Sequence, residues 1–463
     1  MGDRTLIRTG HLITVDPALG EVPGGEVLIE DRRIVAVGRD LPADGAQVVD
    51  APDMIGLPGF VDTHRHTWQA LIRNIGSDWT LAQYFAGVRG VLGGVFRPED
   101  NHAGTLVGVL ESLDSGITTL LDWSHNMNSP EHADAVVQAH RESGSRVVLA
   151  YGNSNDEWLP VSDKPHSRDV LRLRRQYFSS DEGLDGRITL AMAVRGPQFA
   201  TLDVTEHDWK LAREAGCRIT VHVGDGLWGL DKPLVQLDSR GLLGPDTTYV
   251  HCNALHEDDF RLMADTGGTA SIAPELEMHM GHGDVATRRL LAHGIRPSIG
   301  IDVVTSIGGD MFSAMRACLA AELAMANHDA LEERRVLDPL PLMTTDVLEF
   351  ATIQGARAVG LEARIGSLTP GKEADLILID TRSLNLIPMN NPRGGVVMSA
   401  HPGNVDSVWV AGRRVKADGR LLDVDLAAVR RAVDASRDWV FATAGAQIGG
   451  DWLPRPYQET PTA

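Results

Sequence analysis

The sequence has few cysteines and no long hydrophobic segment. Its three cysteines, Cys217, Cys252 and Cys318, lie far apart, which argues against a disulfide framework and indicates the reduced thiols of a cytoplasmic protein. No stretch reaches about 18 consecutive apolar residues, so no transmembrane helix is predicted. The N-terminus lacks the apolar region of a signal peptide. We therefore expect a cytoplasmic protein without a membrane partner.

Positive charge is also scarce. The chain has 43 Lys and Arg against 63 Asp and Glu, and its net charge is −20. This balance disfavours nucleic acid and anionic membranes as partners. We expect a small-molecule substrate; a cationic one is compatible with the charge, although solubility explains the charge equally well. The length of 463 residues allows a large barrel with a small additional domain, or two to three ordinary domains. We also expect a homo-oligomer, a dimer or larger.

Several motifs of well-known enzyme classes are missing. There is no G-x-S-x-G nucleophile elbow, no P-loop and no H-E-x-x-H zinc motif. No two cysteines are close enough to form the P-C-x-x-C motif of cytidine-type zinc deaminases. These absences argue against a serine hydrolase of that type, a P-loop nucleotidase, a zincin protease and a cytidine-type deaminase.

The two ends of the chain have the same sequence pattern. Residues 1–57 contain short alternating strands separated by turns, and the same pattern returns in residues 366–422. Each part is small for a core of its own, so we expect them to pair into one β-sandwich. Residues 423–463 are expected to form a helix with an apolar docking face, followed by an irregular tail.

Between these parts, residues 58–365 alternate between strand and helix patterns. The expected strands are 60–64, 117–123, 145–152, 188–194, 218–223, 247–252, 269–274 and 296–302. Eight strands separated by helical stretches favour a (β/α)8 barrel over an open sheet. The predicted fold class is therefore α/β, with a TIM-like barrel and a small β-sandwich formed from both chain ends.

Histidines and an aspartate recur at the carboxyl ends of these strands. His64 and His66 end the first strand, and their spacing of two places both imidazoles on one side. His222 ends the fifth strand, His251 the sixth and Asp302 the eighth. Carboxyl ends of barrel strands face a common cavity. Three neutral imidazoles and a carboxylate suit a divalent ion such as Zn²⁺, which converts a bound water into hydroxide near neutral pH. A single pair or histidine is more often structural, so the joint pattern carries this prediction.

The segments PGFVDTHRH, HVGD, VHCNALHEDD, SIGIDVVTS and GSLTPGKEADLILID together resemble the amidohydrolase superfamily. They are most similar to its cytosine deaminase and triazine hydrolase-like (aminohydrolase) subgroup, over nearly the whole chain. The resemblance implies a distorted (β/α)8 barrel with a small β-sandwich and a mononuclear metal, usually Zn²⁺ and sometimes Fe²⁺. By position it implies the metal ligands His64, His66, His222 and Asp302. It also implies that Asp302 accepts the proton of the water, and that His251 polarises the attacked group or orients the hydroxide.

Two features bear on the number of metals and on the proton shuttle. Binuclear relatives carry a carboxylated lysine on the fourth strand, and residues 188–197 contain no lysine, which favours one metal. Deaminase-type relatives have a glutamate three residues after the fifth-strand histidine, where this chain has Asp225. An aspartate supports the same acid–base chemistry, but its carboxylate sits one methylene back. Either the substrate approaches more closely, or Asp225 has another role, such as binding backbone N–H groups in its loop.

Other residues are candidates for substrate binding. The loop after the seventh strand replaces a common Ser-Asn pair with PELEMHMGHGD, where Glu277 and His282 either face the pocket or form a self-contained network. Thr305 follows the eighth strand. Trp68 and Gln69 follow the histidine pair, where an indole can stack on a flat ring and an amide can bind its edge. A tryptophan at such a place is more often simply buried.

The loops after the second, third and fourth strands contribute His125, Asn153 and Arg195. Each has a structural or surface alternative; for Arg195 an ion pair within the protein is favoured. Trp228 is expected in a lid over the pocket. Four further histidines are expected at the surface: His132, His140, His207 and His293.

We therefore predict a mononuclear metal-dependent hydrolase that deaminates, or otherwise hydrolyses a C–N bond of, a nitrogen-rich heterocyclic small molecule. Asp302, His251 and Asp225 are its expected catalytic residues. Two alternatives stay open: a metal-dependent lyase or isomerase on the same scaffold, and hydrolysis of another leaving group, as in dechlorination or amide cleavage. A non-catalytic binding protein is disfavoured, because such a relative would be expected to lose metal ligands.

Overall fold

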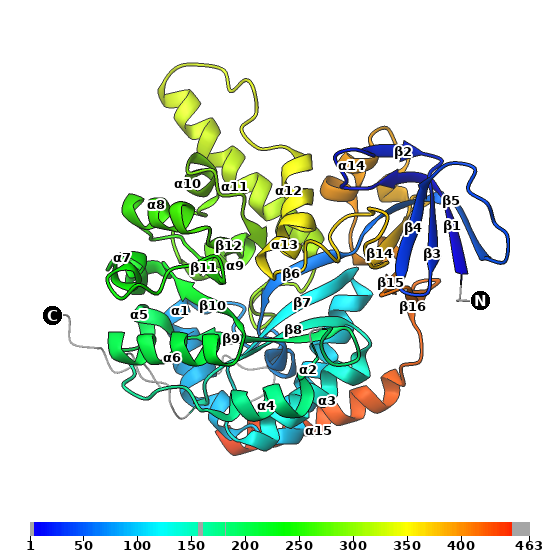
Figure 1. Cartoon of the computed structure of the whole chain (residues 1–463). Helices are drawn as coiled ribbons and strands as arrows, with labels where there is room; N and C mark the ends of the chain where they lie inside the picture. The colour runs from blue at the N-terminus through cyan, green and yellow to red at the C-terminus, as the bar shows by residue number, and fades with distance from the viewer. Residues whose placement is uncertain (1–3, 156–160, 181, 447–463) are drawn as a thin grey trace.

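The larger part of the protein is a barrel of eight parallel strands (Figure 1). The structure is a computed structural model that describes residues 4–155, 161–180 and 182–446. The strands follow one another in chain order: β6 (Phe60–Arg65), β7 (Ile117–Ser124), β8 (Arg146–Tyr151), β9 (Ile188–Val194), β10 (Arg218–Val223), β11 (Thr247–His251), β12 (Thr269–Ile272) and β13 (Ser298–Ile299). A parallel bridge between Arg65 and Asp302 nearly closes the sheet. The barrel expected from the sequence is confirmed.

Helices surround the barrel, and this explains why its strands are continuous apolar runs. Every residue of β7 and β8 is buried, since helices cover the outside and side chains fill the inside. The longer helices are α2 (Pro98–Asp114), α3 (Pro130–Ser143), α4 (Asp169–Tyr177), α6 (Leu202–Glu214), α8 (Glu257–Thr266), α10 (Thr287–Ala292), α11 (Met311–Glu332), α12 (Thr344–Phe350) and α13 (Ile353–Ala358). Gly144 and Gly267 end α3 and α8 in the left-handed conformation.

Short helical segments follow the carboxyl ends of the strands and form the loops of the candidate site. They are η1 (Thr67–Ile72), α1 (Leu81–Tyr84), η2 (Phe85–Leu92), η3 (Gly93–Val95), α5 (Gly196–Phe199), η5 (Gly226–Gly229), α7 (Pro233–Asp238) and α9 (Pro274–Met280). In a barrel of this kind such loops carry the chemistry, while the opposite end carries stability.

The two chain ends pair into one nine-stranded sheet beside the barrel. It contains β1 (Arg4–Ile13), β2 (Glu21–Pro23), β3 (Glu26–Glu30), β4 (Arg33–Gly38), β5 (Gln47–Pro58), β14 (Leu376–Asp380), β15 (Val405–Val410), β16 (Arg413–Ala417) and β17 (Arg420–Leu421). The antiparallel pair β5–β14 joins the early strands to the late ones. The expected association of both chain ends is confirmed, while the proposed domain boundaries stay predictions.

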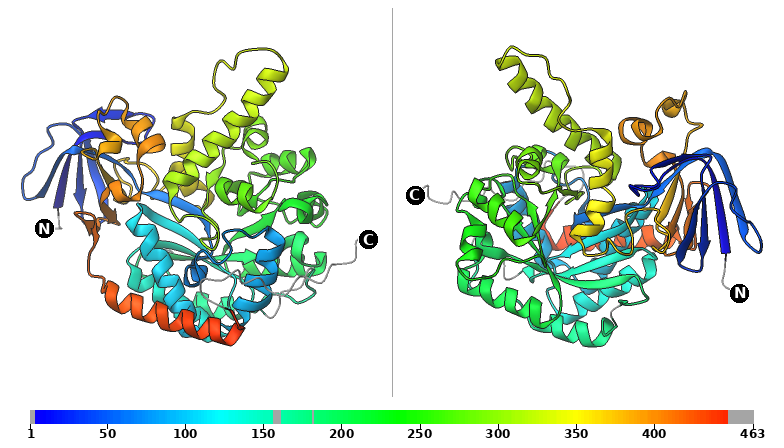
Figure 2. Two further views of the ribbon diagram at one scale, coloured as in Figure 1. Left: turned by 180° about the vertical axis from the view of Figure 1, so that it is seen from behind. Right: turned by 45° about the horizontal axis from the view of Figure 1, so that its top comes forward.

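After β17 the chain continues into α15 (Leu426–Ala444), which packs along α2 (Figure 2). Val440 is buried in this contact, and the Arg97 guanidinium stacks over the Trp439 ring at 4.2 Å. The expected irregular tail lies mostly outside the described residues. Within those residues no helix has both the length and the apolarity to cross a membrane. The expected cytoplasmic location and homo-oligomer stay predictions.

A buried group of charges joins the amino-terminal end of the barrel to the sheet. It consists of Arg146, Arg364, Glu373 and Asp375, which we call the junction cluster. Arg146 donates to Asp375 at 2.7 and 2.9 Å and to Glu373 at 2.6 Å. Arg364 donates to the other oxygen of Glu373 at 2.6 Å, and the backbone N–H of Ala411 donates to Asp375 at 2.6 Å. The cluster therefore ties β8 to the start of β14.

Helix α3 corrects one expectation about histidines. His132 and His140 are buried rather than at the surface, because both lie on the face of α3 that packs inward. The His140 Nε2 lies 2.9 Å from Asp122 on β7, whose other oxygen accepts the backbone N–H of Thr67. His207 and His293 keep partly exposed side chains. His140 thus supports the segment that follows the first strand through Asp122.

Candidate active site

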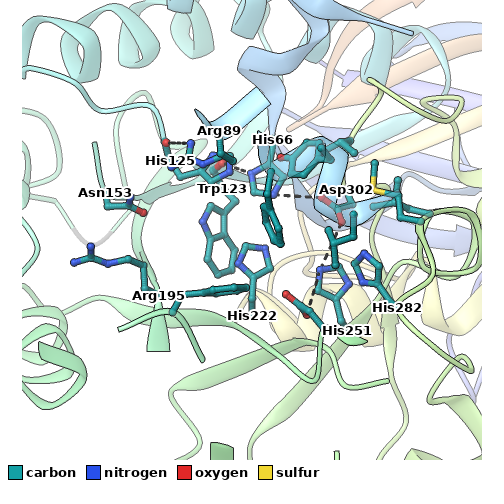
Figure 3. A pocket seen from close by; sticks show the side chains of 18 residues that line it. His66, Arg89, Trp123, His125, Asn153, Arg195, His222, His251, His282 and Asp302 are labelled. Atoms are coloured by element: carbon teal, nitrogen blue, oxygen red, sulfur yellow. Dashed lines mark hydrogen bonds and ion pairs between the residues drawn. The ribbon is translucent and has the colours of Figure 1, made fainter. Parts of the chain in front are cut away.

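Four side chains, those of His64, His66, His222 and Asp302, meet at the carboxyl end of the barrel. Figure 3 labels the last three of them. His64 belongs to β6 and His66 follows it, while His222 belongs to β10 and Asp302 follows β13. The Asp302 Oδ1 lies 3.3 Å from the Nε2 of His64 and 3.3 Å from that of His66. The Nε2 atoms of His64 and His222 are 3.2 Å apart. The structure thus brings together all four residues that the sequence suggests as metal ligands.

Backbone contacts fix this arrangement. The Asp302 N–H donates to the His64 carbonyl at 2.7 Å, and the His66 N–H donates to the Asp302 carbonyl at 3.0 Å. Asp302 has a φ of 69°, a left-handed conformation that costs a non-glycine residue free energy and is found at functional sites. The two hydrogen bonds hold the carboxylate in this conformation, facing the imidazoles.

The donor set fits a divalent metal ion. The His66 Nδ1 lies 2.8 Å from the Trp123 carbonyl, which can only accept, so the Nε2 of a neutral His66 presents a lone pair. Burial lowers the pKa of His64 to about 4, which keeps that ring neutral. A tetrahedral ion with ligands at about 2.0–2.1 Å separates those ligands by about 3.3 Å. The observed spacings of 3.2 and 3.3 Å match this value.

His251 lies beside this centre and is surrounded by carboxylates. Its Nδ1 lies 3.2 Å from Glu277, and its Nε2 lies 3.5 Å from the Oδ2 of Asp302 and 3.9 Å from Asp225. Burial alone would lower the pKa of His251, but the three carboxylates outweigh it and raise the pKa to about 9. Burial would raise the pKa of Asp302, but the neighbouring imidazoles hold it well below the usual range. His251 is therefore a proton donor and Asp302 an anion at neutral pH.

Asp225 occupies the loop directly after β10, and it is 3% exposed. Gln198 accepts the N–H of Gly224 at 2.9 Å, which fixes the start of this loop. Burial raises the pKa of Asp225 to about 6, although His251 acts in the opposite direction. A carboxyl group with such a pKa exchanges protons near neutral pH. Its position and its proton affinity both suit acid–base chemistry.

The pocket above these residues has mainly aromatic and apolar walls. They include Leu81, Tyr84, Phe85, Trp123, Phe199, Leu276, Met280 and Val303. Arg89, His125, Asn153 and Arg195 form its polar side (Figure 3). The Trp123 ring lies 3.8 Å, centroid to centroid, from the ring of His222. A site with flat apolar walls and few polar groups suits a planar small molecule.

The chain was compared with known families and proteins. Residues 55–415 match the model of the Amidohydrolase family. The 5'-deoxyadenosine deaminase of Methanothermobacter thermautotrophicus is 30% identical over 413 residues, which cover 87% of this chain and 91% of that protein. The 5-methylthioadenosine/S-adenosylhomocysteine deaminase of Thermococcus onnurineus is 30% identical over 426 residues, which cover 90% and 95%. The chain belongs to the amidohydrolase family.

Solved structures agree with this assignment. An adenosine deaminase from Xanthomonas campestris with bound zinc superposes with a TM-score of 0.82 at 25% identity, covering 95% of this chain and 99% of that one. Atrazine chlorohydrolase from Arthrobacter aurescens TC1, complexed with zinc, superposes with a TM-score of 0.80 at 23% identity, covering 94% and 100%. This amidohydrolase is thus a metal-dependent hydrolase that acts on carbon–nitrogen bonds other than peptide bonds, and its site binds a divalent metal ion.

The structure divides the expected substrate-binding residues of this amidohydrolase into two groups. His125 and His282 line the pocket, as do the lower-ranked candidates Asn153 and Arg195. Four others are fully buried and are not among the lining residues: Trp68, Gln69, Glu277 and Thr305. Trp68 donates its indole N–H to His125 at 3.1 Å, and Gln69 donates to the Tyr84 hydroxyl at 2.6 Å. These two residues support the pocket wall from behind.

Sequence reasoning missed part of the wall. Tyr84, Phe85 and Arg89 come from the α1–η2 segment, which the sequence does not link to any strand end. One signal was available: Arg89 is the only charge in the apolar, glycine-rich stretch 85–95. Arg89 is 1% exposed and donates to the His125 carbonyl at 2.5 Å. Trp228, expected in a lid, packs edge-on against Phe85 at 5.2 Å.

Proposed function

We propose that this amidohydrolase hydrolyses the C–NH₂ bond of an amino-substituted nitrogen heterocycle, consuming water and releasing ammonia and the corresponding oxo compound. The observation that carries the proposal is that the His251 Nε2 lies between two carboxylates, 3.5 Å from Asp302 beside the metal-ligand imidazoles and 3.9 Å from Asp225. Relatives of known activity that match almost the whole chain are deaminases of adenine-containing compounds. We further propose Zn²⁺ as the resident ion, with Fe²⁺ as the alternative, because zinc is bound in the similar adenosine deaminase.

His64, His66, His222 and Asp302 would hold the ion. When bound, such an ion supplies Lewis acidity and makes water acidic enough to attack carbon near neutral pH. Asp302 is the anion nearest to the imidazoles that would hold the ion. It accepts the water's proton at its Oδ2. His251 faces that oxygen at 3.5 Å and donates a hydrogen bond to the oxygen developing on the attacked carbon. Glu277 holds the imidazole of His251 in the required orientation.

Asp225 serves the leaving group. With its pKa raised to about 6 by burial, it holds a proton more readily than an exposed aspartate does. It therefore protonates the departing nitrogen, which turns a poor leaving group into neutral ammonia. The shorter side chain requires the heterocycle to lie closer to β10 than a glutamate would. Flat stacking against the aromatic walls is compatible with such an approach.

A screen for ammonia release tests the proposal. The protein loaded with Zn²⁺ is tested separately with adenosine, 5'-deoxyadenosine, 5-methylthioadenosine and S-adenosylhomocysteine. Free amino-heterocycles are tested in parallel. Free bases are included because the cavity volume of the pocket is only about 50 Å³. We expect one ammonia per product and a mass gain of 1 Da, because an amino group is replaced by oxygen. A product of unchanged mass would instead favour a lyase or isomerase.

Variants of residue 225 test the proton shuttle. We expect Asp225→Asn to lower kcat by about 10²–10⁴-fold, while the metal content and the melting temperature stay near those of the wild type. Asp225→Glu should retain more activity than Asp225→Asn, since it keeps the ionisable group. If both variants turn over as fast as the wild type, Asp225 is a loop residue without a catalytic role.

A further inference from the structure

A second group of potential metal ligands lies next to the first. One ligand atom each from Asp225, His251 and His282 lies within 4.8 Å of the others. All three side chains are nearly inaccessible, at 3%, 2% and 2% exposure. Asp225 follows β10, His251 ends β11, and His282 follows α9 after β12. The backbone N–H of Gly226 donates to the His282 carbonyl at 3.1 Å, which ties two of these loops together. The outer oxygen of Asp302 faces this group at 3.5 Å from the His251 Nε2.

The imidazole of His282 has no role in the protein's own hydrogen bonding. Neither of its ring nitrogens has a hydrogen-bond partner, and the Oδ1 of Asp225 also lacks one. Buried imidazoles and carboxylates normally have partners, because an unsatisfied buried polar atom costs about 1–3 kcal/mol. The His282 ring lies edge-on to that of His251, with centroids 4.7 Å apart. Figure 3 shows His282 next to His251, and one ligand atom of Asp225 lies within 4.8 Å of a ligand atom of each histidine.

The orientation of His251 matches that of a metal ligand. Its Nδ1 faces the Glu277 carboxylate at 3.2 Å, and its Nε2 faces Asp225 and Asp302. Glu277 is itself held by the Ala273 N–H at 2.7 Å. Metal-binding histidines almost always donate their second ring N–H to such a carboxylate, which fixes the tautomer and the ring plane.

The charge of this region also favours a cation. Three carboxylates, Asp225, Glu277 and Asp302, surround the single imidazole of His251. No lysine or arginine among the described residues forms an ion pair with any of the three. The ion-pair partners of these three carboxylates among the described residues are therefore all histidines.

We propose that Asp225, His251 and His282, together with the outer oxygen of Asp302, form a second binding site for a divalent cation of the zinc type. Two imidazoles and carboxylate oxygens are a suitable ligand set for Zn²⁺. Asp302 then bridges the two ions, with one carboxylate oxygen toward each. The second ion binds more weakly than the first, because the two cations repel each other. It also occupies Asp225 and His251, so filling the second site inhibits the reaction. This inhibition rests on the proposed function.

Zinc stoichiometry, measured without substrate, tests the site. The purified protein is dialysed against rising concentrations of free Zn²⁺, and bound metal is determined by elemental analysis. We expect the wild type to pass from one equivalent to two, and His282→Ala and His282→Asn to stop at one. His279→Ala is the matched control, since His279 is an exposed histidine on the same short helix, and it should bind two. Circular dichroism and melting temperature report whether each variant is folded, and the asparagine variant keeps a polar side chain of similar size.

Two outcomes would overturn the proposal: a wild type that stays at one equivalent at millimolar Zn²⁺, or a second equivalent that persists in both folded His282 variants. Stoichiometry does not depend on turnover, so a failed ammonia screen would leave this test intact. Where ammonia release is found, the Zn²⁺ concentration that fills the second site should slow the wild type, whereas the rate of each His282 variant should not change over that range. Undiminished turnover with two ions bound would disprove the inhibitory role.

Discussion

Two buried polar clusters at opposite ends of the barrel differ in how their charges are matched. In the junction cluster, Arg146 and Arg364 supply hydrogen bonds to both oxygens of Glu373 and to Asp375. At the other end, imidazole nitrogens face one another and one carboxylate, as in the 3.2 Å approach of two Nε2 atoms. The carboxylates of the first cluster are paired with guanidinium groups of the protein, while the second cluster becomes complete only with an added cation. The cluster whose charges are paired within the protein holds the fold together. The cluster whose imidazoles and carboxylate face one another without such pairing is a binding site.

The difference also predicts what each cluster contributes. Removing one partner of a buried ion pair leaves an uncompensated charge and costs about 3–5 kcal/mol. Removing a metal ligand relieves mutual crowding of imidazoles and leaves no such charge. Changes in the junction cluster should therefore act on stability, and changes at the carboxyl end of the barrel should act on metal binding and turnover.

The largest effect is expected from His66→Ala. This variant should lose the first metal ion, and ammonia release should fall by at least about 10³-fold, because the attacking water is no longer activated. Its melting temperature, measured on metal-free protein, should stay close to that of metal-free wild type. Elemental analysis and calorimetry check both parts. If His66→Ala unfolds while its metal content is unchanged, the two clusters do not differ as described.

A large loss of stability is expected from Arg146→Met. This substitution leaves the buried Asp375 without its ion-pair partner, while Glu373 keeps Arg364 and the more exposed Arg32. The free energy of unfolding should therefore fall by about 3–5 kcal/mol. Arg364→Met is the matched control: the Arg364 side chain is 27% exposed against 1% for Arg146, and its loss should cost about 1 kcal/mol. Urea unfolding measures both values. Equal costs, or a metal content that falls with Arg146→Met in still-folded protein, would contradict the comparison.

Acid should weaken the junction cluster through Glu373. Burial alone would raise the pKa of Glu373, but Arg146 and Arg364 outweigh it and lower the pKa to about 2. A depressed carboxyl pKa stabilises the folded state above the unfolded pKa near 4.5, and this contribution is lost as the pH falls toward 2. After allowance for solvent screening it amounts to about 2 kcal/mol.

The variant Glu373→Gln measures this contribution. The difference in unfolding free energy between wild type and Glu373→Gln should be constant from pH 7 to about pH 5.5. It should shrink below that, because the unfolded chain then takes up a proton at Glu373 while the folded protein does not until the pH approaches 2. A difference that stays constant down to pH 3.5 would show that Glu373 is not the titrating group.

The sequence predicts the barrel and the convergence of His64, His66, His222 and Asp302 because both depend on short-range rules. A buried strand is an apolar run, and the residue at its carboxyl end faces the cavity of a parallel barrel. The inward face of α3 follows from a short-range rule as well, because helical spacing places His132 and His140 on the same apolar face as Val136. The expectation that these two histidines lie at the surface is wrong, although the spacing of apolar residues in α3 already indicates that they lie on its inward face.

The pocket wall could not be predicted in the same way. Tyr84, Phe85 and Arg89 lie in a helical segment whose position is set by tertiary contacts, such as that of Phe85 with Trp228. Conversely, Trp68 and Gln69 lie next to the metal ligands in sequence, but η1 turns both side chains into the protein. Adjacency along the chain does not fix the direction of a side chain once the strand has ended.

The smallest effect is expected from Glu277→Gln, which tests whether the active-site cluster depends on orientation as well as charge. Glu277 contacts His251 at 3.2 Å and is not among the residues that line the pocket, so it acts by positioning the imidazole. We expect kcat to fall by at least about tenfold with little change in KM, and the first metal ion to remain bound. Glu277→Asp keeps the charge but withdraws the carboxylate, so it should give an intermediate kcat. A purely structural role would instead lower the melting temperature and leave the kcat of the folded fraction unchanged, which active-site titration can resolve. A drop in kcat without a change in stability would show that a side chain outside the pocket controls the chemistry within it.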